Sequence, residues 1–235
     1  MSLEKILVVI PTYNESENIE KLIQELKSLE HHIMIVDDNS PDGTSEIVEN
    51  LKEKNNNLYL IKRESKLGLG SAYRDGFKAA MNMGYEFFVE MDADFSHQTI
   101  DLVEMIKNID KADVIIGSRY IEGGGIKGWN YKRRLLSKLA NLFTQILFGY
   151  HIKDSTSGFR IYNRESLEKI NFQKTKSDGY SFQIEMTYRA NKKNLKILEI
   201  PITFYERRKG ESKMTGQIIN EAIISLFKLR FGKID

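Results

Sequence analysis

The chain of 235 residues contains no cysteine, only three prolines and one tryptophan, and a net charge of only +2. Without cysteine there are no disulfides, no zinc sites built on thiolates and no cysteine nucleophile. No apolar run approaches the roughly 20 residues that a membrane-spanning helix needs, and Met1–Lys5 does not begin a signal peptide. We therefore expect a soluble or peripheral protein with no transmembrane domain.

The small net charge argues against a general nucleic-acid binder. Its distribution is uneven, because residues 126–164 hold eight Lys and Arg side chains against one acid, Asp154. A basic segment on a nearly neutral protein is typical of an anionic partner, either a phosphate or acidic lipid headgroups. A solvated helix face would give the same count, so charge alone does not decide between them.

The first hundred residues alternate short apolar runs with helical spacing of apolar side chains. This order predicts an α/β fold with a mostly parallel central sheet and right-handed crossovers. The predicted strands are 6–10, 33–36, 58–61 and 87–91, and the predicted helices are 19–29, 47–51 and 72–83.

The second half is less regular and shows no linker or repeat, so we expect one domain over residues 1–235. Residues 1–118 would form a nucleotide- and metal-binding half and residues 119–235 an acceptor half. Predicted strands are 114–117, 159–162, 195–200 and 202–205; predicted helices are 132–150, 182–190 and 216–231, of which the first and last are amphipathic.

The strongest candidate for chemistry is the pair Asp92 and Asp94, which directly follows the predicted strand 87–91. Open α/β sheets bind ligands at the carboxyl ends of their strands. Two carboxylates separated by one residue form a hard-oxygen site suited to Mg²⁺ or Mn²⁺ carrying a diphosphate.

Acidic residues also follow the first two predicted strands. Tyr13 could flank a nucleobase and Asp38 could accept a hydrogen bond from a ribose or base, whereas Asp42 has the spacing of a turn or helix cap. Three acidic loops on neighbouring strand ends would repel one another unless a cation or ligand donors compensate. This favours a metal–nucleotide site over three unrelated turns.

Other patterns point away from alternative chemistry. The glycines in 66–72 match neither common phosphate-binding motif, so we expect them to allow a tight turn into the next helix. The histidines give no nucleophilic triad, although His97 is close enough to Asp94 to leave a metal contact open. Arginines in the second half could meet the acidic site across a cleft, since arginine suits bidentate phosphate binding.

Several motifs together resemble a known family. They follow the order found in dolichyl-phosphate mannosyltransferases, inverting enzymes of glycosyltransferase family 2 with the GT-A fold, and the resemblance covers nearly the whole chain. The motifs are Pro11–Glu15, Val36–Asp38 with Ser40–Thr44, Asp92–Asp94, Gly117–Arg119, Asp154–Arg160, Ser177–Glu185 and Gly210–Lys213.

The resemblance implies a role for each matching position. Asp94, Arg119 and Arg133 would be catalytic, Asp92 and Asp94 would bind the metal, and Ser96 stands where some members have a metal-contacting glutamine, leaving Ser96 or water to complete the metal shell. The acceptor phosphate would contact Arg119, Arg133 and Ser137. The donor nucleotide sugar would contact Pro11, Tyr13, Glu15, Val36, Asp38, Asp92, Ala93, Asp94, Arg119, Arg207 and Lys213.

The implied activity is transfer of mannose from GDP-mannose to dolichyl or polyprenyl phosphate. Two alternatives stay open: the same fold using UDP-glucose, and a non-catalytic nucleotide-sugar-binding subunit. A processive polysaccharide synthase is disfavoured, because the single Trp129 is not part of a Gln-x-x-Arg-Trp motif.

A lipid acceptor requires access to a membrane. We expect helices 132–150 and 216–231 to lie on the bilayer surface with their cations at the headgroups, which would make the protein peripheral on the cytoplasmic face. Packing of both helices on the sheet is the alternative. A membrane-spanning partner subunit would be another solution.

Overall fold

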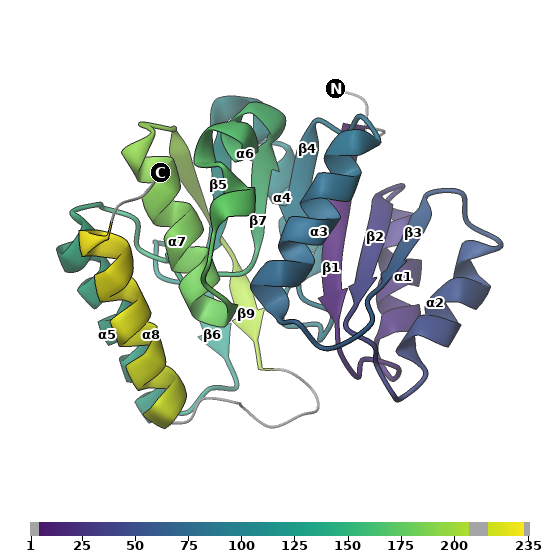
Figure 1. Ribbon diagram of the computed structural model, residues 1–235, viewed down its shortest axis with the longest axis horizontal. Coiled ribbons are helices and arrows are strands. Elements are labelled where there is room, and N and C mark those ends of the chain that lie inside the picture. The colour runs from purple at the N-terminus through teal and green to yellow at the C-terminus, as the bar shows by residue number, and fades with distance from the viewer. Residues whose placement is uncertain (1–4, 207–215, 233–235) are drawn as a thin grey trace.

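The computed structural model describes residues 5–206 and 216–232. It shows a seven-stranded sheet in the order β3-β2-β1-β4-β7-β5-β8 and a two-stranded β6-β9 sheet (Figure 1). The strands are β1 (Ile6–Thr12), β2 (His32–Asp37), β3 (Leu58–Lys62), β4 (Phe87–Glu90), β5 (Val114–Ser118), β6 (Gly125–Lys127), β7 (Arg160–Asn163), β8 (Ile197–Pro201) and β9 (Thr203–Tyr205).

Helices cover both faces of the large sheet (Figure 1). α1, α2 and α4 pack on one face, and α3, α6 and α7 pack on the other. The helices are α1 (Ile19–Ser28), α2 (Thr44–Lys52), α3 (Leu69–Asn82), α4 (Thr99–Ile106), α5 (Tyr131–Phe148), α6 (Arg164–Ile170), α7 (Gly179–Lys192) and α8 (Gly216–Phe231), with short 3-10 turns at Ile109–Lys111 and Phe172–Lys174.

The central strands are buried on both faces, which explains their composition. Every residue of β1 from Ile6 to Ile10 is fully buried, and its side chains alternate between the two apolar cores. A strand covered by helices on both faces needs a continuous apolar run rather than an alternating one. The mostly parallel sheet predicted from these runs is confirmed.

One strand runs against the others. β7 lies between β4 and β5 and is antiparallel to both. The chain therefore leaves the sheet after β5, forms β6 and α5, and returns to fill the gap at the centre. Helices α4 and α6, and strand β6 in its glycine loop, were not predicted from the sequence.

α5 and α8 lie side by side at one end of the molecule, away from the sheet (Figure 1). The rings of Phe143 and Phe227 are 6.0 Å apart, and Arg230 Nε donates to the carbonyl oxygen of Leu147 over 3.0 Å. α8 also places Leu226 in a small core with α7. These helices thus pack on each other and on α7 rather than flat on the sheet. Among the described residues, no helix is both long and apolar enough to cross a membrane.

Candidate active site

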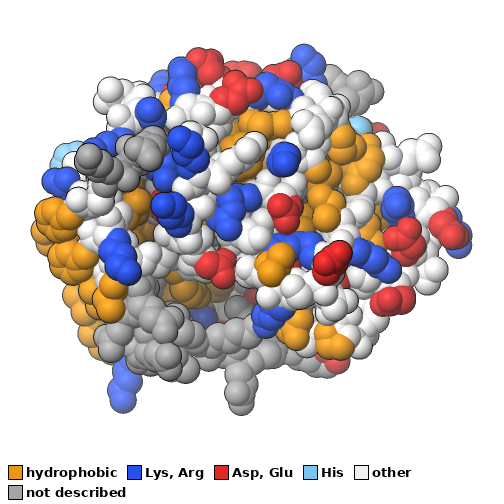
Figure 2. All heavy atoms as spheres, viewed as in Figure 1, with side chains coloured by type: hydrophobic (Ala, Val, Ile, Leu, Met, Phe, Trp, Pro, Cys, Tyr) orange, Lys and Arg blue, Asp and Glu red, His pale blue; other side chains and the backbone are white. Residues whose placement is uncertain are grey.

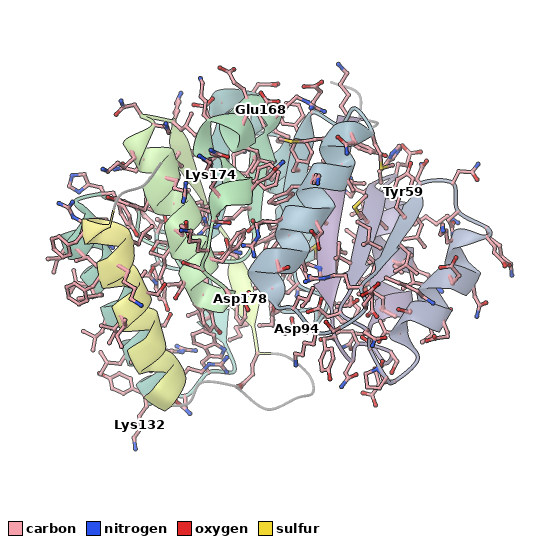
Figure 3. The ribbon with its side chains drawn as sticks, in the orientation of Figure 1. Tyr59, Asp94, Lys132, Glu168, Lys174 and Asp178 are labelled. Atoms are coloured by element: carbon pink, nitrogen blue, oxygen red, sulfur yellow. The ribbon has the colours of Figure 1, made fainter. Side chains whose placement is uncertain are left out.

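The candidate residues gather at the carboxyl edge of the sheet, which is the lower edge in Figure 3, where Asp94 is labelled. Tyr13 follows β1, Asp38 follows β2, Asp92 follows β4 shortly after its last residue, and Arg119 follows β5. β1 pairs with both β2 and β4, so the first three loops are neighbours. The sheet topology therefore brings together the acidic motifs that the sequence separates.

The loop after β4 presents two carboxylates with different exposure. The side chain of Asp92 is 36 % exposed, whereas Asp94 is 8 % exposed and its Oδ1 accepts a hydrogen bond from the Ser96 amide over 3.0 Å. The side chains of Ala93 and Ser96 are buried. Ala93 is thus limited to main-chain contacts with a ligand.

His97 packs against Phe159 and is hydrogen-bonded to the loop that carries Asp92 and Asp94. Its ring stacks on Phe159 with 4.7 Å between the centroids, and its Nδ1 accepts a hydrogen bond from the Asp92 amide over 3.2 Å. Burial lowers the pKa of His97 to about 4, so the ring is neutral at physiological pH. His97 therefore holds the main chain of the acidic loop in place.

Asp92 and Asp94 fit a divalent metal that is shared with a ligand. Carboxylate oxygens are the ligands that Mg²⁺ and Mn²⁺ prefer. Within residues 5–206 and 216–232 there is no group of three or more His, Cys, Asp or Glu side chains able to hold a metal by itself. Oxygens of a bound diphosphate would have to complete the coordination.

Both carboxylate oxygens of Asp38 have partners within the protein. It is 5 % exposed and pairs with Arg63, with 3.0 Å between Oδ1 and Nη1. Its other oxygen accepts hydrogen bonds from the amides of Leu67 and Gly68 over 3.2 and 3.0 Å. The expectation that a cation or ligand donors compensate the acidic loops is therefore wrong for Asp38, because Arg63 does so. Nucleoside binding by Asp38 stays a prediction.

The loop held by Asp38 reaches over Tyr13. Lys66 places its ammonium 3.6 Å from the centroid of the Tyr13 ring. Gly68, at φ +96°, begins the turn into α3 as predicted, and a side chain there would collide with Asp178. Asp178, labelled in Figure 3, in turn accepts a hydrogen bond from the Gly70 amide over 2.6 Å.

The remaining candidates for nucleotide binding differ in which of their atoms are accessible to a ligand. Pro11 is partly exposed at the end of β1, whereas the Val36 side chain is fully buried in the core and leaves only its main chain for a ligand. Glu15 is partly exposed and its Oε2 accepts a hydrogen bond from Asn18 over 2.9 Å. Arg207 and Lys213 lie outside the described residues.

Arg119 is buried beside Asp154 across the site. Its Nε and Nη2 donate to the two oxygens of Asp154, both over 2.7 Å, and Nη2 also donates to Thr156 Oγ1 over 2.8 Å. Burial favours the neutral form of Asp154, but the adjacent guanidinium outweighs this and lowers the pKa of the carboxyl. Likewise, the carboxylate outweighs burial and raises the pKa of Arg119. Both groups are charged.

Arg133 approaches Arg119 from helix α5. Trp129, which is 8 % exposed, contacts both: its ring centroid is 4.0 Å from Cζ of Arg133 and 5.6 Å from Cζ of Arg119. Arg133 also pairs with Glu206 over 3.0 Å. Ser137 lies one turn further along α5 and is partly exposed. The structure thus brings the three predicted acceptor-phosphate residues to one region.

Three contributors to this architecture were given no role from the sequence: Trp129, Asp178, which lies inside the motif Ser177–Glu185, and Asn141. Trp129 is the only tryptophan in a segment rich in Gly and Arg, and this composition was an available signal. Asp178 and Asn141 act through partners more than ten residues away, which no local pattern reveals.

Comparison with known proteins identifies the family of this chain. The model of the glycosyl transferase family 2 domain matches residues 7–171. The chain belongs to glycosyl transferase family 2. It is 43 % identical over 227 residues to the polyprenol monophosphomannose synthase of Mycolicibacterium smegmatis, a match that covers 95 % of this chain and 86 % of the relative.

A second relative and a solved structure extend the comparison. The undecaprenyl-phosphate mannosyltransferase of Micrococcus luteus is 38 % identical over 224 residues, which cover 94 % of this chain and 92 % of the relative. The mannosyltransferase PcManGT from Pyrobaculum calidifontis, solved with GDP-Man and Mn²⁺, superimposes with a TM-score of 0.64 at 18 % identity over 98 % of this chain and 66 % of that chain. The fold is the expected GT-A fold.

Proposed function

We propose that this protein is an inverting glycosyltransferase that transfers mannose from GDP-mannose to dolichyl or polyprenyl phosphate. The observation that carries the proposal is that the partly exposed Asp92, the buried Asp94 and Arg119 all follow strands at the carboxyl edge of the sheet, and that Arg119 and Arg133 both contact the indole ring of Trp129. The names of the two curated relatives support the sugar and the acceptor class.

The chemistry requires positioning more than a general base. A lipid monophosphate has a second pKa of about 6, so much of it is dianionic near neutral pH and nucleophilic without proton removal. An acceptor oxygen attacks the anomeric carbon, the bond from that carbon to the diphosphate breaks with its electron pair, and GDP leaves with inversion. A direct displacement of this kind needs no catalytic base.

Each half of the site has a separate task. Asp92 and Asp94 would hold a Mg²⁺ or Mn²⁺ ion, which supplies positive charge to stabilise the departing diphosphate. Arg133 and Ser137 on α5, with Arg119 at the end of β5, would hold the acceptor phosphate behind the anomeric carbon. Holding two reactants in line accounts for a large part of the barrier reduction in such reactions.

The acceptor half also carries a membrane-facing surface, which we call the α5/α8 face. Figure 2 shows hydrophobic side chains gathered at the left edge of the molecule over these helices, with Lys and Arg beside them. Exposed apolar residues on it are Leu135, Leu136, Leu139, Leu142, Ile146, Ile223, Ile224, Phe227 and Phe231, and exposed cations are Lys132, Arg134, Lys138, Lys228 and Arg230.

A surface of this kind suits the interface of an anionic bilayer. Amphipathic helices bury their apolar face at the boundary of headgroups and acyl chains, and nearby cations bind anionic headgroups. A bilayer there would present the lipid phosphate next to the N-terminal turn of α5, where Arg133 lies. The cytoplasmic face and a membrane-spanning partner subunit stay predictions from the family resemblance.

Vesicle co-sedimentation tests the α5/α8 face. Leu139→Glu is expected to reduce binding to vesicles of phosphatidylcholine and phosphatidylglycerol by at least several-fold. Ile100→Glu on α4 is a matched control, since Ile100 is 71 % exposed outside this face. Equal binding by both variants, or no binding by the unmodified protein, would contradict the membrane assignment.

The function is tested by transfer of labelled sugar into an organic-extractable lipid, with polyprenyl phosphate and Mg²⁺ or Mn²⁺. GDP-mannose is expected to give labelled lipid, and chelation is expected to abolish it. UDP-glucose in place of GDP-mannose tests the other donor. Nucleotide binding without transfer from either donor would favour the binding-only alternative.

A further inference from the structure

The proposed acceptor-phosphate site is divided between two elements. Arg119 belongs to the end of β5, whereas Arg133 and Ser137 belong to the first turns of α5. A dianionic phosphate can be held by both parts only if the distance between them is fixed. The question is which contact fixes the position of α5 relative to β5.

The face of α5 that points inward is polar where it meets this site. Asn141 and Thr144 are 2 % and 1 % exposed, and Phe148 continues the same stripe. The outward stripe, by contrast, is the apolar part of the α5/α8 face. At Asn141 and Thr144 the inner side is therefore attached to the protein body by hydrogen bonds.

Asn141 occupies the centre of these bonds. Its Nδ2 donates to Thr156 Oγ1 over 3.1 Å and lies 3.5 Å from Oδ1 of Asp154, and its Oδ1 accepts from Ser155 Oγ over 3.1 Å. Asp154 and Thr156 are the two side chains that hold the guanidinium of Arg119. One amide thus joins α5 to the direct partners of Arg119.

The same amide is joined to Ser137. Asn141 Nδ2 also donates to the carbonyl oxygen of Ser137 over 3.1 Å. Asn141 consequently contacts one proposed phosphate ligand in its own helix and, through Asp154 and Thr156, a second one on β5. The position of this side chain is coupled to both parts of the divided site.

Energetics favour a positioning role over simple packing. A buried amide is unfavourable unless its donors and acceptors are paired, and a leucine of similar size would fill the same space without that requirement. Fully paired polar networks in a core restrict the arrangement of the elements they join, because each hydrogen bond is directional. This gives the network a geometric function that an apolar contact would lack.

We propose that Asn141 is a positioning residue that sets the spacing between Arg119 and the phosphate-binding turns of α5. The inference rests on the proposed function, since it assigns the acceptor phosphate to these residues. It also implies that the position of α5 affects the position of Arg119 through the buried amide of Asn141. The outer side of α5 belongs to the membrane-facing surface.

The test compares Asn141→Leu with Thr144→Val in the full chain. Thr144 is buried on the same side of α5, but its hydroxyl contacts Ser155 rather than the partners of Arg119. The acceptor is a short, water-soluble polyprenyl phosphate, so membrane binding does not enter the measurement. KM is determined separately for this acceptor and for GDP-mannose.

Asn141→Leu is expected to raise the acceptor KM roughly tenfold, the size of one lost charge-assisted contact, while the KM for GDP-mannose changes less than about twofold. Thr144→Val is expected to leave both constants within about twofold. Asn141→Ser, which keeps a small polar group, is expected to fall between Asn141→Leu and the unmodified protein, and it serves as the second variant if Asn141→Leu does not fold.

Equal changes in both KM values, or the same acceptor effect in Thr144→Val, would show that Asn141 only stabilises the fold. An unchanged acceptor KM in a folded Asn141→Leu protein would overturn the inference while leaving the glycosyltransferase function intact. An unmodified protein that transferred no sugar would remove the function and this inference together.

Discussion

Asp38 and Arg63 form an ion pair inside the protein, with 3.0 Å between the charged atoms and side chains that are 7 % and 4 % exposed. The pair joins the ends of β2 and β3 and fixes the loop that leads to α3. The same loop places Lys66 on the ring of Tyr13. The Asp38–Arg63 ion pair thus helps to shape the proposed nucleoside pocket, and it is a contact within the protein that does not involve a ligand.

Asp38→Asn is expected to reduce the free energy of unfolding by about 3 kcal/mol, because it removes the buried partner of Arg63 and leaves this buried charge with only the half-exposed Asp75 as an acidic neighbour. Urea denaturation measures this change, and calorimetric titration with GDP is expected to show weaker binding. Asp75→Asn is the matched control, since Asp75 contacts Arg63 at 3.6 Å but its side chain is 50 % exposed. A similar loss of stability in the control would contradict the importance of burial.

Asp154→Asn tests the second buried pair. We expect a loss of about 3–5 kcal/mol in the free energy of unfolding, since Arg119 would keep its charge without a partner. The exposed pair of Glu165 and Lys169 offers a comparison, and Glu165→Gln is expected to leave the thermal midpoint nearly unchanged. The measurement is thermal unfolding followed by circular dichroism; equal midpoints for the two variants would refute the prediction.

Asp94→Asn addresses the metal. An asparagine can still accept the hydrogen bond from the Ser96 amide but offers no negative charge to Mn²⁺, so turnover is expected to fall by roughly 100-fold or more and the Mn²⁺ concentration for half-maximal activity to rise. Asp110→Asn controls for the loss of an exposed carboxyl far from the loop. Near-normal turnover would remove Asp94 from the mechanism.

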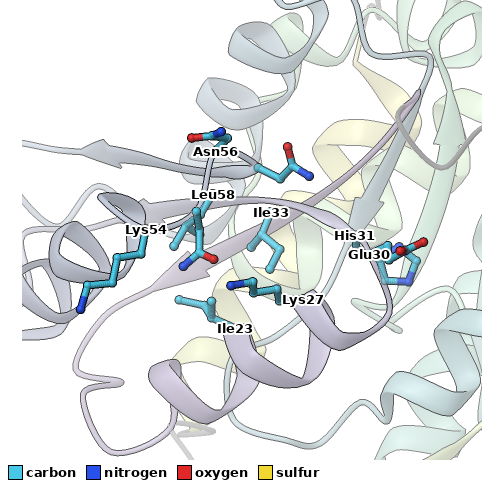
Figure 4. A pocket seen from close by; sticks show the side chains of 10 residues that line it. Ile23, Lys27, Glu30, His31, Ile33, Lys54, Asn56 and Leu58 are labelled. Atoms are coloured by element: carbon cyan, nitrogen blue, oxygen red, sulfur yellow. The ribbon is translucent and has the colours of Figure 1, made fainter.

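His31 predicts how stability depends on pH. It lies in a pocket of about 290 Å³ at the amino ends of β2 and β3, beside Glu30 in Figure 4. His31 is 4 % exposed, and neither ring nitrogen has a hydrogen-bond partner among the described residues. Burial, and secondarily the charge of His32, lowers the pKa of His31 below its ordinary 6.5.

Because the unfolded chain then binds a proton that the folded chain resists, the stabilisation present above pH 6.5 is lost as the pH falls toward the lowered pKa. His31→Asn is expected to flatten this acid-side loss. Urea unfolding at several pH values between 7 and 5 provides the measurement, with His151→Asn as an exposed control. An unchanged pH slope in His31→Asn would assign the acid sensitivity to other groups.

The sequence predicted the parallel core because residues 6–10 and 33–36 are uninterrupted apolar runs and residues 87–91 are interrupted only by Glu90, and such runs are typical of strands buried on both faces. It also marked Asp92, Asp94 and Arg119 as candidates, because their position shortly after a strand is a local feature, and their roles in a site stay predictions. The orientation of β7 was not predictable in this way. An apolar run has no direction, and its orientation depends on where α5 returns the chain.

The ion-pair partners of the charged residues could not be predicted from local sequence patterns either. Asp38 was assigned to the nucleoside because the sequence shows its place after a strand, while its partner Arg63 lies 25 residues away. Arg119 was assigned to phosphate binding, yet its carboxylate partner comes 35 residues later. Residue type and spacing indicate that charges are present, whereas the tertiary fold decides which of them neutralise each other.

The central position of β7 has a consequence for biosynthesis. A ribosome that has released residues up to Ser118 has delivered β4 and β5, but the strand that joins them is not complete until Asn163. Until then each nascent strand has an open edge, and open edges pair readily with other chains. Translation speed between Arg119 and Asn163 therefore sets how long the growing chain is exposed to misassembly.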